Sequence, residues 1–140
     1  MIREIMGRSE IITIVEDSGD SYLDPNTNRI HWNPTMGVLT DVGVVMSPAT
    51  VLNHEADHAL QGIKNPNQKA TDINTPDRDY GNKEEKRVIT GSEQETAKKH
   101  EEIKEGEVTR TNHGGNTYDT KSPPTTEGKN EVVVSANRRN

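Results

Sequence analysis

Residues 47–62 read SPATVLNHEADHALQG and contain the clearest helix signal in the chain. Ser47 is a residue type that caps helix N-termini, and Pro48 suits the first helical position. Residues 49–61 contain neither Gly nor Pro, whereas Gly62 is a residue type at which helices end. We therefore predict a helix over residues 49–61. Its apolar residues and both of its histidines fall near one side at helical spacing; these are Val51, Leu52, His54, His58, Ala59 and Leu60.

The segment before this helix predicts a small antiparallel sheet. Residues 10–16 are rich in β-branched side chains, residues 21–23 suit a short strand, and residues 29–32 alternate polar and apolar side chains. Pro and Asn within residues 24–28 favour a tight reversal, and Asn33-Pro34 ends the last strand because Pro cannot donate to a ladder. We expect this sheet over residues 10–33 and a short strand at residues 42–45. Packed on the helix, the sheet gives an α+β fold.

The second half of the chain is more polar. Residues 64–82 contain Pro66, Pro76 and Gly81 and predict a surface loop. Residues 83–90 predict a short helix, which Gly91 weakens and which residues 92–105 have the composition to continue. From residue 106 the chain is polar and lacks periodicity, which predicts a disordered or loosely draped tail, with residues 132–134 as a β-prone exception. We therefore expect one domain over residues 1–105 and a polar tail over residues 106–140.

The composition narrows the classes of function. Of the 140 residues, 28% are hydrophobic and 29% are charged, and both Phe and Cys are absent. The net charge of −6 argues against nucleic-acid binding, which needs a basic face. The chain lacks an apolar stretch of about 18 residues, so we expect neither a transmembrane helix nor a membrane partner. Because Cys is absent, the ligands of any metal must be His, Asp or Glu side chains.

His54 and His58 have the spacing of a metal-binding pair. Residues four apart share one face of a helix, with Cβ atoms about 5–6 Å apart. Two imidazoles at this separation reach one Zn²⁺ at about 2.0–2.1 Å. Glu55 points about 100° around the helix from His54, from where it reaches a water in the open coordination position. The metal lowers the pKa of this water, and Glu55 acts as the catalytic general base that passes the proton to a leaving amine.

A catalytic zinc site usually has a third protein ligand. Glu85 is the first candidate, because on a helix it shares the apolar face of Val88 and Ile89. The other carboxylates rank, in falling order, as Glu84, then Glu93 and Glu95, with Asp72, Asp77 and Asp79 left open in the predicted loop.

Several other polar residues have alternative interpretations. Asp57 either faces solvent, which is the favoured placement, or orients a histidine. His31 is expected on an edge strand, exposed or in the cleft, and His100 on a solvated helix face. His113 is expected to be an ordinary loop residue, with a role as a ligand or oxyanion stabiliser as the alternative. Tyr80 and Tyr118 are candidate oxyanion donors.

Three segments together form a family-like pattern: IHWNP at residues 30–34, SPxxxLxHExxHA at residues 47–59 and EExxVxxG at residues 84–91. Over residues 29–97 this pattern resembles the effector-type zinc metallopeptidases. These occur as bacterial type III effectors and as C-terminal metallopeptidase toxin domains of RHS-repeat proteins, whose polar C-termini the segment 106–140 also resembles. The resemblance implies a compact zincin-like fold, zinc bound by His54 and His58 with a Glu of the 84–85 pair, and Glu55 as catalytic base.

The leading hypothesis is a zinc-dependent metallopeptidase, a toxin or effector with a protein or peptide substrate and an immunity protein as a further partner. The N-terminus lacks an apolar run long enough for a cleaved signal peptide. We therefore expect delivery from a bacterium by another route, or a cytoplasmic location. The alternatives are a catalytically inactive zincin-like module that binds a metal or a partner, and an interaction domain in which the motif is accidental.

Overall fold

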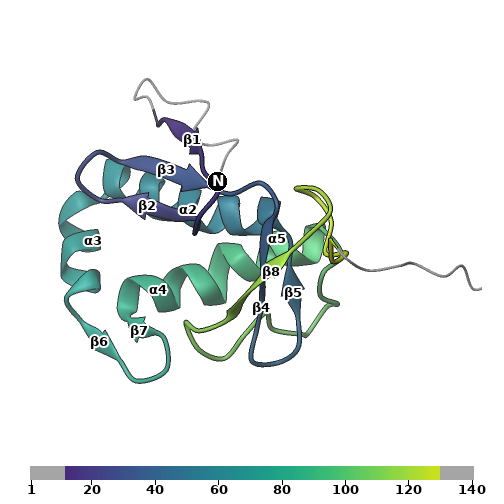
Figure 1. The fold of residues 1–140 in the computed structure, drawn as a ribbon. Helices are drawn as coiled ribbons and strands as arrows, with labels where there is room; N and C mark the ends of the chain where they lie inside the picture. Colours follow the sequence, from purple (N-terminus) through teal and green to yellow (C-terminus); the bar gives the residue numbers. More distant parts are fainter. Residues whose placement is uncertain (1–11, 130–140) are drawn as a thin grey trace, which may run out of the picture.

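The computed structural model describes residues 12–129 and arranges them around one long helix, α2 (Pro48–Lys64) (Figure 1). A three-stranded sheet packs against one side of α2. A second helical run, formed by α4 (Lys83–Val88), the π-helical turn η1 (Ile89–Glu93) and α5 (Gln94–Lys99), packs against another side. The combination of helices with small sheets confirms the predicted α+β class.

Helix α2 begins where its sequence predicts. The Ser47 hydroxyl accepts a hydrogen bond from the Thr50 amide at 3.3 Å, and Pro48 occupies the first helical position. The carboxylate of Glu102 accepts hydrogen bonds from the amide and the hydroxyl of Ser47 at 3.2 and 2.5 Å, and so ties the start of α2 to the segment after α5. The helix continues through Gly62 to Lys64, beyond the predicted end at residue 61.

The first sheet consists of β1 (Ile14–Glu16), β2 (Tyr22–Asp24) and β3 (Arg29–Trp32) in the order β1-β3-β2. The pairing of β2 with β3 is antiparallel as predicted, but β1 pairs with β3 in parallel, so the expectation of an all-antiparallel sheet is wrong. Asn33 explains the difference, because its side chain donates to Gly19 O at 3.0 Å and its amide donates to Ser21 Oγ at 2.9 Å. These bonds hold the connection from β1 to β2 across the end of β3. His31 therefore lies on the central strand and not on an edge.

The second sheet consists of β4 (Met36–Leu39), β5 (Val45–Met46) and β8 (Asn116–Asp119) in the order β5-β4-β8, with antiparallel pairs. Strand β5 begins at Val45, where the predicted strand over residues 42–45 ends. Strand β8 comes from the segment expected to be disordered. The same segment donates a buried Thr120 amide to Thr35 O at 2.7 Å and accepts from the Ala49 amide through Pro123 O at 3.0 Å.

The prediction of a disordered tail is therefore wrong for residues 106–129, where paired backbone and buried polar side chains hold the chain on the domain. Residues 130–140, including the β-prone segment 132–134, lie outside the described residues.

Residues 64–82 are not the predicted surface loop. They form α3 (Pro66–Ile73) and a small hairpin of β6 (Pro76–Asp77) and β7 (Gly81–Asn82). Pro66 suggests a break in the sequence, but here it occupies the first turn of a helix, where its missing amide proton costs nothing. Gly81 adopts a φ of 87°, a left-handed conformation that favours Gly just before α4.

The core between α2 and the first sheet is small. Ile30, Ala56 and Ala59 are fully buried at its centre, and the two alanines let α2 approach the sheet closely. The partly buried residues around them are Ile12, Leu23, Leu52 and Trp32. On the other side of α2, the fully buried side chains include Val88 and Ile89 but also Glu84 and Glu93. Buried carboxylates are costly unless they are paired, so this side of the helix requires a polar network.

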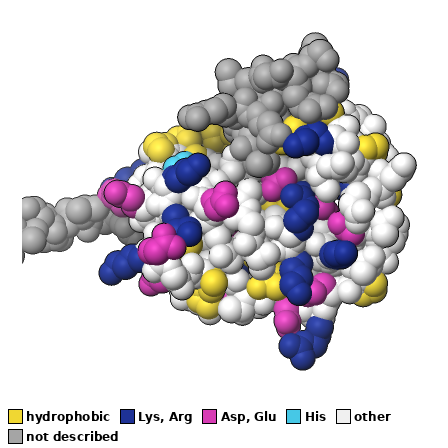
Figure 2. Space-filling model, turned by 180° about the vertical axis from the view of Figure 1, so that it is seen from behind, with side chains coloured by type: hydrophobic (Ala, Val, Ile, Leu, Met, Phe, Trp, Pro, Cys, Tyr) yellow, Lys and Arg dark blue, Asp and Glu magenta, His cyan; other side chains and the backbone are white. Residues whose placement is uncertain are grey.

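The face opposite to the view of Figure 1 has a mixed surface. Figure 2 shows Lys and Arg side chains interspersed with Asp and Glu, and hydrophobic side chains scattered between them. None of the helices within residues 12–129 combines the length and the apolar character that a membrane span requires.

Candidate metal centre

Helix α2 directs His54 and His58 toward the same point. Both residues are buried, at 4% and 5% exposure, and their Nε2 atoms lie 3.1 Å apart. The two rings are close to perpendicular, at 77°, with centroids separated by 4.8 Å. The spacing predicted from the sequence therefore places both imidazoles side by side on one buried face.

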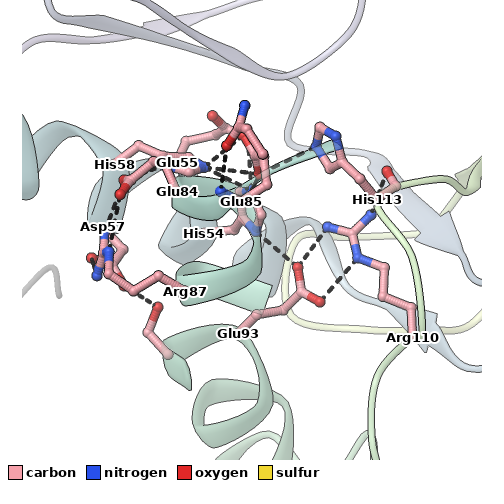
Figure 3. A network of polar contacts seen from close by, with 12 residues as sticks. His54, Glu55, Asp57, His58, Glu84, Glu85, Arg87, Glu93, Arg110 and His113 are labelled. Carbon is pink, nitrogen blue, oxygen red and sulfur yellow. Dashed lines mark hydrogen bonds and ion pairs between the residues drawn. The ribbon is translucent and has the colours of Figure 1, made fainter. Parts of the chain in front are cut away.

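Helix α4 brings Glu85 to the same point (Figure 3). Its Oε1 atom lies 3.2 Å from His54 Nε2 and 3.1 Å from His58 Nε2. The start of α4 fixes this position, because the Asn82 side chain caps the helix by accepting from the Glu85 amide at 2.9 Å. Of the predicted third-ligand candidates, Glu85 is the one whose carboxylate meets both Nε2 atoms.

Two further carboxylates hold the opposite nitrogens of the same imidazoles. His54 Nδ1 lies 2.8 Å from Glu93 Oε1, and His58 Nδ1 lies 2.8 Å from Glu84 Oε2. Because an ionised carboxylate only accepts hydrogen bonds, each Nδ1 donates its proton to its own carboxylate, and the Nε2 atoms are the nitrogens that face Glu85. Glu84 and Glu93 ranked behind Glu85 as ligand candidates. They contact the Nδ1 atoms of the histidines and not the Nε2 atoms that face Glu85. Such partners fix the tautomer and orientation of metal-binding histidines.

Each of these outer carboxylates is neutralised by an arginine. Arg87 donates to Glu84 at 2.9 and 3.0 Å and to Asp57 Oδ1 at 3.0 Å. Asp57 is buried and also accepts from the Ser92 hydroxyl, so the favoured expectation that it faces solvent is wrong. It supports His58 indirectly, through Arg87 and Glu84.

The second arginine comes from the segment after α5. Arg110, only 7% exposed, donates to Glu93 through Nη2 at 2.7 Å and through Nε at 3.1 Å. The Thr109 hydroxyl adds a bond to Glu93 at 2.6 Å. Sequence reasoning missed Thr109, Arg110 and Arg87. For Arg87 a signal was present, because it follows Glu84 at the i,i+3 spacing of a helical ion pair.

The π-helical turn η1 brings Glu93 to this network. A π-turn contains more residues than an α-turn and therefore re-aims the side chains that follow it. Gly91 lies within η1, where a Cβ atom would meet nothing within 4 Å. The Gly91 position thus marks a change of helical geometry and not the end of the helix.

The close contacts within the cluster shift the pKa values of His54, His58 and Glu85. Burial alone lowers the pKa of His54, but hydrogen bonds to Glu85 and Glu93 outweigh it and raise this pKa to about 10. The pKa of His58 is raised in the same way, since Glu84 and Glu85 outweigh its burial. Burial raises the pKa of Glu85, yet the hydrogen bonds from His54 and His58 hold that pKa far below its usual range. Without a metal, the cluster therefore stabilises positive charge at the paired Nε2 atoms.

Glu55 lies beside this point without belonging to it. Its Oε2 atom is 3.9 Å from His54 Nε2, and its side chain is 15% exposed. It lines two pockets: one of about 160 Å³ with Val38, Val51 and His113, and one of about 220 Å³ with Leu23, Ile73 and Lys69. The glutamate is thus accessible from solvent, whereas the histidines beside it are buried.

A third histidine reaches the same carboxylate. His113 Nε2 lies 3.2 Å from Glu85 Oε1, and its ring is parallel to that of His54 within 8° at a centroid separation of 6.5 Å. The ligand atoms of His54, Glu85 and His113 all lie within 4.8 Å of one another. The ordinary-loop interpretation of His113 is therefore wrong, and the residue belongs to the cluster (Figure 3).

The donor set fits a divalent metal. Two ligands at about 2.0–2.1 Å from one tetrahedral zinc lie about 3.3 Å apart. The three separations among His54 Nε2, His58 Nε2 and Glu85 Oε1 are 3.1, 3.1 and 3.2 Å. Nitrogen and carboxylate donors suit zinc.

The remaining candidates lie elsewhere. His31 contacts Asp17 at 3.3 Å and stacks on Tyr22, and His100 contacts the Thr50 hydroxyl at 2.8 Å. Asp77 accepts from the amide of Tyr80 at 2.9 Å within the β6–β7 turn, and Asp72 accepts from Gln68. Asp79 pairs with Arg78, Glu95 is exposed on α5, and Tyr118 lies on β8.

Comparison of the chain with protein-family models, with curated proteins and with solved structures finds no match. The function must therefore be argued from the chemistry of the cluster itself.

Proposed function

We propose that this chain is a zinc-dependent peptidase. The observation that carries the proposal is the convergence of His54 Nε2, His58 Nε2 and Glu85 Oε1 within 3.1–3.2 Å of one another, with Glu55 beside them. These three residues would hold the metal. Bound zinc supplies Lewis-acid polarisation of a carbonyl and a water of lowered pKa.

Residues of the chain would transfer the protons and position the histidines. Glu55 accepts the proton of the attacking water on its carboxylate and delivers it to the nitrogen of the leaving amine, so that the peptide bond breaks and a C–O bond forms. Its position in the two pockets suits this role, because the proton acceptor must meet both water and substrate. Glu84 and Glu93 keep the Nδ1 protons in place, which holds the Nε2 lone pairs on the metal side.

The pockets on either side of Glu55 favour a peptide substrate. The pocket with Leu23, Pro25 and Ile73 offers apolar side chains next to Glu55, and Ile73 is 45% exposed. On the opposite side, Val38 and Val51 line the pocket that His113 also borders. A chain that passes Glu55 would contact both, as hydrolysis of an internal peptide bond requires. By its resemblance to effector-type metallopeptidases, we further propose a bacterial toxin or effector role, with an immunity protein as partner.

The proposed function is tested with Glu55→Gln. We expect this variant to bind zinc like the wild type and to lose at least about 100-fold in peptide-library hydrolysis, the scale of general-base catalysis. Glu95→Gln, at an exposed carboxylate on α5, is the matched control and should retain full activity. Full hydrolysis by Glu55→Gln would refute the mechanism.

One observation favours a second candidate, a catalytically inactive metal-binding module. Structural zinc sites have four protein ligands, and His113 offers a fourth donor here. Zinc binding without cleavage of any library peptide by the wild type would select this candidate.

A further inference from the structure

We propose that His113 is a fourth metal ligand, one that closes the centre in the resting protein and gives up its place when a peptide enters. This inference rests on the proposed metal centre and adds a ligand that the helical motif does not contain.

The distances place His113 within reach of the metal. Its Nε2 atom is 3.2 Å from Glu85 Oε1, the same separation that Glu85 Oε1 has from His54 Nε2. Three imidazole nitrogens therefore surround one carboxylate oxygen, and the ligand atoms of His54, Glu85 and His113 all lie within 4.8 Å. Ligands of a tetrahedral zinc lie about 3.3 Å apart, and His113 Nε2 already has this separation from Glu85 Oε1.

His113 approaches from the solvent side. Its side chain is 49% exposed, whereas those of His54 and His58 are 6% exposed. It lines the two pockets on the side of Val38 and Val51, one of which also contains Glu55. A peptide that fills this space must contact or displace the imidazole. His54 and His58 stay in place, because Glu93 and Glu84 hold their Nδ1 atoms.

The loop around His113 is held through its backbone, whereas the imidazole itself is half exposed. Arg110 Nη1 donates to the carbonyl oxygens of His113 and Gly114 at 3.3 and 3.1 Å. The same guanidinium binds Glu93, which binds His54 Nδ1, so one arginine positions both the fixed and the movable histidine. Gly114 and Gly115 follow His113 directly, and glycines give the backbone freedom to move.

With His113 as a fourth ligand, the same donors would form a closed metal site at rest and an open one when a peptide binds. Four protein donors make a closed site, whereas catalysis needs an open position for water and substrate. An imidazole at the mouth of the site keeps the metal bound tightly until a substrate replaces it. The alternative is that His113 donates a hydrogen bond to a developing oxyanion. In that role the imidazole never binds the metal, and the experiment below distinguishes the two roles.

The test compares His113→Ala and His113→Gln with wild type and with His100→Ala, a histidine outside the cluster. Zinc affinity is measured by competition with a chromophoric chelator, and the coordination of Co²⁺ by its visible absorption. We expect both His113 variants to bind zinc roughly 10- to 100-fold more weakly, the range over which even outer-shell partners act. We also expect an altered Co²⁺ spectrum, while His100→Ala matches wild type.

Unchanged zinc affinity and an unchanged Co²⁺ spectrum would overturn the proposal. If hydrolysis then falls, His113 is an oxyanion donor. Failure of the proposed function has a different signature: the affinity loss in His113→Ala persists, but no peptide is cleaved even by wild type. A wild type that binds no metal would refute both.

Discussion

The isosteric change Glu93→Gln is the most informative perturbation of the hydrogen-bond network behind the proposed metal centre. The carboxylate accepts four hydrogen bonds, from His54 Nδ1, Thr109 Oγ1 and two nitrogens of Arg110. The amide of Gln keeps the volume but turns one acceptor oxygen into a donor, so two of the four bonds lose their acceptor. The substitution also leaves the guanidinium of Arg110, which is 7% exposed, without the charge of Glu93.

The magnitude follows from these losses. Removing one partner of a buried ion pair costs about 3–5 kcal/mol, a large fraction of the roughly 5–15 kcal/mol that stabilises a domain. Loss of an outer-shell hydrogen bond to a metal-binding histidine costs about 10- to 100-fold in metal affinity, or about 1.4–2.8 kcal/mol. We therefore expect a lower urea midpoint for the metal-free variant and weaker zinc binding for the folded variant.

The assay combines urea denaturation, followed by the fluorescence of Trp32, with chelator competition for zinc. The matched control Glu95→Gln changes an exposed carboxylate nearby and should stay within about 0.5 kcal/mol of wild type. If Glu93→Gln matched this control in both measurements, the network through Arg110 and Glu93 would have no role in holding His54.

Three further predictions follow from the structure. The raised pKa of His54, about 10 against an ordinary 6.5, adds stability to the metal-free protein that is complete below pH 6.5 and is lost as pH rises toward 10. Zinc must displace this proton, so zinc affinity should rise over the same window; parallel pH profiles of melting temperature with EDTA and with zinc would contradict this. Gly37→Ala should destabilise by about 1–3 kcal/mol in urea denaturation, because its Cβ would lie 2.3 Å from Met46 O. Gly91→Ala, with open space around its Cβ, should be neutral or stabilising by up to about 1 kcal/mol; equal urea midpoints for the two variants would contradict the packing. A chain ending at Glu105 lacks Thr109, Arg110 and His113 and should bind zinc at least about 10-fold more weakly; wild-type affinity would show that this segment does not support the site.

Local signals made the centre of the fold predictable. The cap at Ser47, the proline at Pro48 and the periodicity of residues 49–61 all act within one helix, so α2 and the shared face of His54 and His58 could be predicted. Glu85 ranked first on the expectation of a buried face shared with Val88 and Ile89, but Glu84 is the more buried of the pair, and Glu85 is 19% exposed. The antiparallel pairing of β2 with β3 depends on one short turn, and it was also predictable.

Features that depend on long-range contacts could not be predicted in this way. The parallel pairing of β1 with β3 requires the connection to β2 to cross the end of β3, where Asn33 bonds to Gly19 and Ser21. Pro66 breaks one helix and begins the next, and only the packing of α3 on α4 distinguishes this from a loop.

The segment after residue 105 shows most clearly what composition cannot predict. Composition predicts disorder when apolar residues are too few to bury. Thr109, Arg110 and Thr120 are nevertheless buried, because Glu93 and backbone carbonyls provide their partners. Burial driven by paired charges carries no hydrophobic pattern, so the contribution of Arg110 becomes visible only in the folded structure, whereas His113 was one alternative in the sequence.

The zinc content of the purified protein is the most direct test of a metal site formed by His54, His58 and Glu85. Wild type, Glu55→Gln, His58→Ala and the control His31→Ala are purified, exposed to zinc, desalted and analysed by mass spectrometry. We expect about one zinc per chain in wild type, Glu55→Gln and His31→Ala, and little or none in His58→Ala. Zinc-free wild type, or the same zinc content in His58→Ala as in wild type, would contradict it.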